Sequence, residues 1–143
     1  MCGGVYFEHN GDVIRQYFPN PKAVLPIKMK DDSLILLPWG RRQNQTGSLP
    51  LGGWARLESI HMGRWDRFFP KPVKIPVLSF MEKDFEGIPH WYDLNKGQYI
   101  QGLLARDNNE QRLYVVTIEP ELDDANIHRR RPRVVQAGEN RTL

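Results

Sequence analysis

Eleven prolines and twelve glycines spread through the 143 residues divide this sequence into short segments. Neither residue suits the interior of a helix or of a central strand, so the regular elements must be short. No internal repeat or low-complexity segment is visible between these breaks. We therefore expect a single domain over residues 1–143, rich in short strands, with a polar tail at 136–143.

The apolar segments between the breaks have the composition of strands. They cover residues 5–7, 23–29, 34–37 and 113–118. Residues 73–81 are also β-branched and apolar, but Pro76 lies inside them, which predicts an edge or a bulge. Residues 90–94 and 98–104 flank a short segment that ends in Gly97, and this arrangement predicts a hairpin.

Helical spacing is weaker and local. Residues 59–69 carry apolar side chains at nearly helical intervals, and residues 119–128 begin with acidic residues that suit a helix start. Residues 54–60 alternate, which favours a strand with Arg56 and Glu58 on one face. The predicted fold class is α+β and β-rich, a strongly bent sheet or barrel-like core with two or three short helices.

The cysteine and histidine content narrows the function classes. A single cysteine excludes an intramolecular disulfide and a cysteine-rich zinc site, and the four histidines lack the spacing of metal ligands. We expect no metal, no cofactor and a monomer. The absence of a long apolar run or a secretory start predicts a cytoplasmic protein, nucleoid-associated if it is bacterial.

The charge is mildly basic, with a formal net charge of +3. Arginines cluster at residues 129–133 and at residues 41–42. Such clusters attract nucleic acid, although a solvated charged surface has the same composition.

Cys2 is the residue with the most chemical information. It is the sole cysteine, and two glycines follow it. Removal of Met1 would place an α-amine and a thiol on one residue, with ordinary pKa values of about 8 and about 8.5. A 1,2-aminothiol condenses with an aldehyde: the amine forms an imine, and the thiol then closes a thiazolidine ring. The alternative is a small buried apolar residue.

Three further positions carry candidate chemistry. Arg56 and Glu58 form a charge pair, which at a surface contributes little stability. Glu82 ends an apolar strand, where a desolvated carboxyl can act as an acid or a base. His128 precedes the arginine cluster and suits a proton shuttle beside phosphate.

Five short motifs together resemble the SOS-response-associated peptidase family, over about residues 2–135. In chain order they are Met1-Cys2-Gly3, Trp39-Gly40, Ala55-Arg56-x-Glu58, Phe80-x-Glu82 and Ile127-His128-x-Arg130-x-Pro132. The resemblance implies a DNA damage response protein that crosslinks to abasic sites in single-stranded DNA. It also implies lyase-type chemistry and a hydrolytic, self-processing peptidase activity at the N-terminus.

The resemblance also implies residue roles. Cys2 is the nucleophile, Glu82 moves protons, and His128 helps to open the sugar and to form or reverse the crosslink. On the DNA side, Arg56 contacts phosphate, and Trp39 with Gly40 shapes the surface. The remaining residues expected on the DNA-binding side are Trp54, Glu58, Arg129, Arg130 and Arg131.

The sequence departs from the family pattern at several points. Gly4 stands where an arginine is common, and Phe18 and Trp54 stand where the family has asparagines. The chain also ends soon after the histidine motif. Two alternatives therefore stay open: a non-catalytic single-stranded nucleic-acid-binding module, and a cysteine peptidase that acts on other proteins.

Overall fold

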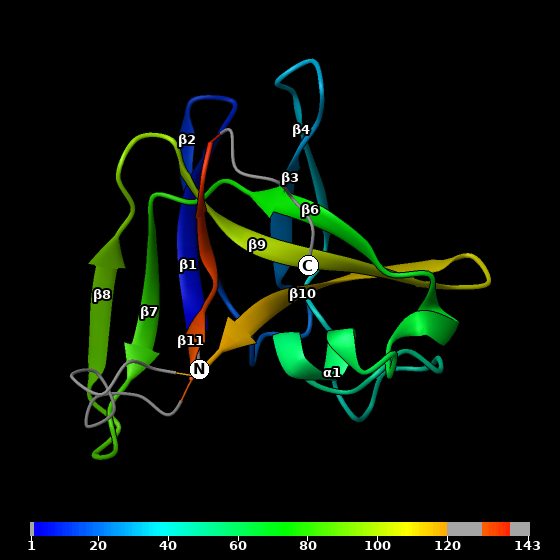
Figure 1. Ribbon diagram of the computed structural model, residues 1–143. Coiled ribbons are helices and arrows are strands. Elements are labelled where there is room, and N and C mark those ends of the chain that lie inside the picture. Colours follow the sequence, from blue (N-terminus) through cyan, green and yellow to red (C-terminus); the bar gives the residue numbers. More distant parts are fainter. Residues whose placement is uncertain (1, 120–129, 138–143) are drawn as a thin grey trace.

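The computed structural model describes residues 2–119 and 130–137 of this chain (Figure 1). A four-stranded sheet has the order β2-β1-β7-β8. Its strands are β1 (Cys2–His9), β2 (Asp12–Tyr17), β7 (Ser79–Lys83) and β8 (Pro89–Asp93). The turn between β1 and β2 uses Asn10 and Gly11, both at positive φ, as a tight hairpin requires.

A second, six-stranded sheet is built around the two longest strands. These are β9 (Gln98–Asp107) and β10 (Glu110–Ile118), joined by antiparallel pairing. The other four are β5 (Trp54–Arg56), β6 (Lys71–Ile75), β11 (Arg131–Pro132) and β12 (Val134–Gln136). A separate hairpin pairs β3 (Val24–Lys28) with β4 (Leu34–Pro38).

The main core lies where the two sheets and the β3–β4 hairpin meet. In Figure 1 the strands of the four-stranded sheet run crosswise to β9 and β10. Phe7, Leu25, Ile100 and Leu113 come from different elements and are at most 1 % exposed. A second apolar cluster, which includes Tyr114, is covered by residues that follow β5. The short strands are stabilised by this shared burial, since isolated hairpins are marginal in water.

Trp39 connects three parts of this core. Its indole is fully buried, and its Nε1 donates a hydrogen bond to the carbonyl of Gly53 at 3.0 Å. Its backbone nitrogen donates to the carbonyl of Ala23, and that of Gly40 donates to the carbonyl of Leu113. A side chain on Gly53 would clash with Trp39 and Phe18, so the close approach requires glycine there.

The β-rich composition predicted from the sequence is confirmed, but the helices and the closed core are not. The described residues contain one α-helix, α1 (Leu57–His61), and one turn of 3-10 helix (Asp66–Phe68). Gly63, at a φ of +79°, follows α1 and prevents the continuous helix expected over 59–69. The described strands form separate sheets and not a barrel. No helix in this part of the chain is long and apolar enough to cross a bilayer.

Three local predictions are wrong in pairing or extent. Residues 90–94 and 98–104 do not form a hairpin, because β8 pairs with β7 whereas β9 belongs to the other sheet. Residues 73–81 are two strands, β6 and β7, separated around Pro76. The strand expected over 54–60 ends at Arg56, where α1 begins, so Arg56 and Glu58 do not share a strand face. The helix expected over 119–128 lies almost wholly outside the described residues.

Replacement of Gly40 by alanine should destabilise the fold strongly. A Cβ there would lie 2.1 Å from the carbonyl oxygen of Gly52, at a φ of +59°. We expect Gly40→Ala to lower the free energy of unfolding by about 3 kcal/mol, measured by urea denaturation. Gly87→Ala is the matched control, because Gly87 has a φ of +83° but no atom within 4 Å of the added Cβ. Equal losses in the two variants would contradict the steric explanation.

Candidate functional site

Cys2 and Glu82 lie opposite each other on neighbouring strands. In the antiparallel pairing of β1 with β7, Cys2 is the register partner of Glu82, and Gly4 is the partner of Met81. The register shifts between these two pairs, so Gly3 forms a bulge directly after Cys2. Side chains of directly opposed residues are cross-strand neighbours. The predicted nucleophile and the predicted acid–base carboxyl are therefore brought together.

Both side chains are buried away from solvent, and this burial raises the pKa of each. Cys2 and Glu82 are each 0 % exposed. Burial raises the pKa of the Glu82 carboxyl to about 7. Burial, reinforced by the neighbouring Glu82 charge, raises the pKa of the Cys2 thiol far above its ordinary value. The thiol is therefore neutral at physiological pH, and Glu82 is the group that changes protonation near neutrality.

The backbone around Cys2 is held by two further contacts. The Cys2 thiol donates a hydrogen bond to the carbonyl of Gly4 at 3.5 Å. The indole Nε1 of Trp54 donates to the carbonyl of Cys2 at 2.6 Å. The ring of Trp54 packs against Phe18, with centroids 4.7 Å apart. Trp54 thus fixes the peptide of Cys2 through its indole N–H.

Arg56, Glu58 and Arg130 gather around Thr117 of β10. Arg56 is the register partner of Thr117, and Arg130 donates to both the hydroxyl and the carbonyl of Thr117. Arg130 also pairs with the Glu58 carboxylate at 2.8 Å, and this hydrogen bond lowers the pKa of Glu58. Arg56 itself is exposed. Of these three residues, Arg56 is the cation in position to meet a phosphate.

Several residues expected on the DNA-binding side have structural roles. Arg130 is 6 % exposed and engaged by the buried Thr117 and by the exposed Glu58, which corrects its assignment to phosphate binding. Trp39 is fully buried and Gly40 is buried beside it, so neither presents a surface to DNA. Arg131 is half-buried and lines a pocket of about 260 Å³ with Phe80. The predicted residues His128 and Arg129 lie outside the described residues.

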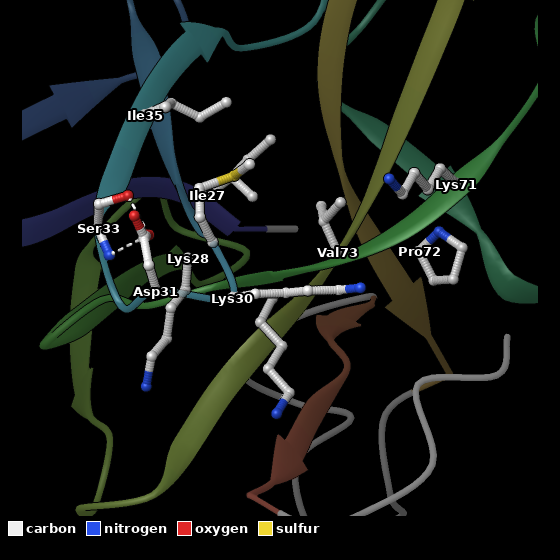
Figure 2. A pocket seen from close by; sticks show the side chains of 11 residues that line it. Ile27, Lys28, Lys30, Asp31, Ser33, Ile35, Lys71, Pro72 and Val73 are labelled. Atoms are coloured by element: carbon white, nitrogen blue, oxygen red, sulfur yellow. Dashed lines mark hydrogen bonds between the residues drawn. The ribbon is translucent and has the colours of Figure 1, made fainter.

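A basic groove lies at a place that sequence clustering did not indicate. It has a volume of about 490 Å³ between the β3–β4 hairpin and β6. Figure 2 shows lysine side chains from both sides of this groove around an apolar floor that includes Ile35 and Val73. The lysines are Lys28, Lys30, Lys71 and Lys74. They form two pairs, Lys28 with Lys30 and Lys71 with Lys74, which are remote from each other in the sequence, so no single charge run reveals the groove.

Two of these lysines share one aromatic ring. The Nζ atoms of Lys28 and Lys74 lie 5.2 and 5.1 Å from the ring centroid of Tyr99. Lys28 also donates to the Tyr99 hydroxyl at 3.0 Å. Lys28 is also paired with the Asp32 carboxylate at 3.4 Å, and Asp31 is the one carboxylate that lines the groove. Four lysines against this one carboxylate leave the lining cationic, which favours an anionic ligand.

The remaining observations concern metals and known proteins. Within residues 2–119 and 130–137, no group of three or more His, Cys, Asp or Glu side chains is arranged to hold a metal ion. A scan against protein-family models and a search of curated proteins found no match to this sequence. The assignment of function therefore depends on the motifs and on the geometry of Cys2 and Glu82.

Removal of the Glu82 charge should change how stability depends on pH. The pKa of Glu82 in the folded protein, about 7, lies above its ordinary value of 4.5, so the folded state binds the proton more tightly. The stability that this proton contributes is complete below pH 4.5 and is lost as the pH rises through 7. Glu82→Gln should avoid this loss and gain up to about 3 kcal/mol over wild type between pH 4.5 and pH 8.

This pH dependence can be measured by urea denaturation across that range. Glu8→Gln is the matched control, because Glu8 lies on the neighbouring strand β1 and is exposed. It should keep the wild-type profile. A parallel shift of the Glu82→Gln and wild-type curves at all pH values would show that the Glu82 carboxyl does not titrate as described.

Proposed function

We propose that this protein captures abasic sites in single-stranded DNA covalently through Cys2, as a divergent relative of the SOS-response-associated peptidase family. The observation that carries the proposal is the pairing of Cys2 with Glu82, a buried carboxyl whose pKa is about 7. A group with that pKa both donates and accepts protons near neutral pH, which this condensation requires.

The chemistry requires Cys2 to be the first residue. While Met1 is attached, the Cys2 nitrogen is an amide and cannot form an imine. After removal of Met1, the free amine attacks the aldehyde of the ring-opened abasic sugar and gives a carbinolamine. Protonated Glu82 donates a proton to the carbinolamine hydroxyl, which leaves as water, and an iminium ion remains.

The thiol then closes the ring. Its sulfur attacks the iminium carbon, the Glu82 carboxylate accepts the thiol proton, and the C=N electron pair moves onto the nitrogen, which becomes the thiazolidine amine. One water is released overall, and Glu82 returns to its starting protonation state. A base is needed in this step because the thiol has a raised pKa in its buried environment.

The surrounding cations support a nucleic-acid substrate. Arg56 is exposed in β5, two residues after the Trp54 that contacts the Cys2 carbonyl, and the basic groove supplies four lysines elsewhere on the surface. These contacts would bind phosphate without reading bases, so the affinity should fall as the salt concentration rises.

The mature protein should form a denaturation-resistant adduct with abasic single-stranded DNA. We expect the adduct mass to equal the sum of the two masses minus one water, measured by intact-mass spectrometry. Cys2→Ala should abolish it, and Glu82→Gln should slow its formation by about 100-fold, since a positioned acid–base group contributes a factor of that order. Intact DNA should give no adduct.

Retention of Met1 provides a second control for the amine. A protein that keeps Met1 should give no adduct, and its thiol should resist maleimide under native conditions because Cys2 is buried. Processed protein without adduct formation would exclude covalent capture. DNA binding would then favour the non-catalytic module if it depends on salt and is unchanged in Cys2→Ala. The complete burial of Cys2 is the observation that supports this alternative.

A further inference from the structure

Two adjoining pockets lie on the face of the four-stranded sheet opposite to the core. Their volumes are about 390 and 230 Å³, and both are lined by Tyr17, Met81 and Lys83. We call them together the aromatic groove. The other lining residues are Gly3, Phe18, Pro19 and Trp54 in the first pocket, and Pro89 and Trp91 in the second.

The strand register explains why these side chains share one face. Tyr17 is the partner of Gly4, Gly4 of Met81, and Met81 of Trp91, so the four form a row across the sheet. The neighbouring Val5 points to the other face and is fully buried in the core. A Cβ on Gly4 would lie 3.0 Å from the Tyr17 ring. The missing side chain at Gly4 therefore lets Tyr17 and Met81 pack over the backbone there and form part of the groove lining.

The groove begins at the peptide of Cys2. Gly3, the next residue, lines the first pocket, and Trp54 in that pocket donates to the Cys2 carbonyl. Trp54 and Phe18, which both replace asparagines of the family pattern, pack ring against ring there. The guanidinium of Arg42 lies 4.2 Å from the centre of the Phe18 ring. The two departures from the pattern thus build one wall next to Cys2.

The chemistry of the lining is aromatic and cationic. Tyr17 and Trp91 are 41 % and 38 % exposed, with ring centroids 6.3 Å apart. Lys83 is a cation shared by both pockets, and neither described lining contains a carboxylate. Flat aromatic faces with an adjacent ammonium suit an anionic strand that carries planar rings, since bases stack on aromatics and phosphates pair with lysine.

We propose that the aromatic groove binds nucleobases that flank the captured site, stacked on Trp91 and on the Phe18–Trp54 wall, with Lys83 at a phosphate. This inference rests on the proposed function for the identity of the strand. It extends that function, because it gives the protein affinity for the intact nucleotides beside a lesion and not only for the aldehyde.

The test uses binding without crosslinking. In a Cys2→Ala background, fluorescence anisotropy would compare a labelled oligothymidine with a strand of equal length made of tetrahydrofuran abasic units, which carry no aldehyde. The oligothymidine should bind more tightly. Trp91→Ala should weaken oligothymidine binding about tenfold, so that its affinity no longer exceeds that for the abasic strand. Trp91→Phe should keep most of the affinity for oligothymidine.

Phe69→Ala is the matched control, because Phe69 is an exposed aromatic, 64 % exposed, with Arg106 over its ring outside the aromatic groove. It should bind as the parent does. Equal affinity for the two strands, or unchanged binding by Trp91→Ala, would overturn the proposal. So would binding of a proline-rich peptide in place of the oligothymidine, since such peptides also use aromatic grooves.

Adduct formation by the processed protein with native Cys2 separates the two proposals. If adducts form while Trp91→Ala leaves oligothymidine binding intact, the proposal for the aromatic groove is wrong and the proposal of covalent capture is supported. If the base-dependent binding is lost in Trp91→Ala while no adduct forms, the proposal for the aromatic groove is supported and the proposal of covalent capture is wrong.

Discussion

The burial of the Trp39 indole is the constraint on which the arrangement of the two sheets depends. Its ring packs in the main core, and its N–H is satisfied by the carbonyl of Gly53. The same carbonyl also accepts from the backbone of Val115, so one peptide joins the indole to β10. A buried indole N–H without an acceptor would be costly, so this bond specifies how the loop before β5 lies against the hairpin of β3 and β4. The position of β5 then follows, and with it that of Trp54 beside Cys2.

The candidate site depends on the same packing. Cys2 begins β1, and β7 supplies Glu82 from a distant part of the chain. The core that fixes Trp39 also removes Cys2 from water. Desolvation of the site is therefore a consequence of the core packing, and it is also the cause of the raised pKa of Glu82. A polar asparagine in place of Trp54 would leave the Cys2 peptide in a more polar environment, whereas the tryptophan closes it with an aromatic wall.

Two grooves in the described part of the chain support the proposed binding of nucleic acid, and they differ in chemistry. The basic groove combines lysines with an apolar floor, and the aromatic groove combines rings with a lysine. One face of the four-stranded sheet carries the aromatic groove, while the other packs in the core. Antiparallel strands produce this division, because successive side chains point to opposite faces.

The sequence by itself determined the β-rich class, the strands over residues 23–29 and 34–37 and the strand at β10, and it singled out Cys2 and Glu82 as candidates. Each of these follows from local composition or from motif order. Only the tertiary structure decided that β8 and β9 belong to different sheets, and that Trp39 and Arg130 are buried. It also decided that the four lysines meet, and that Phe18, Trp54 and Trp91 line one groove. Strand pairing and burial join residues remote in the chain, and local composition does not encode which partner a strand selects.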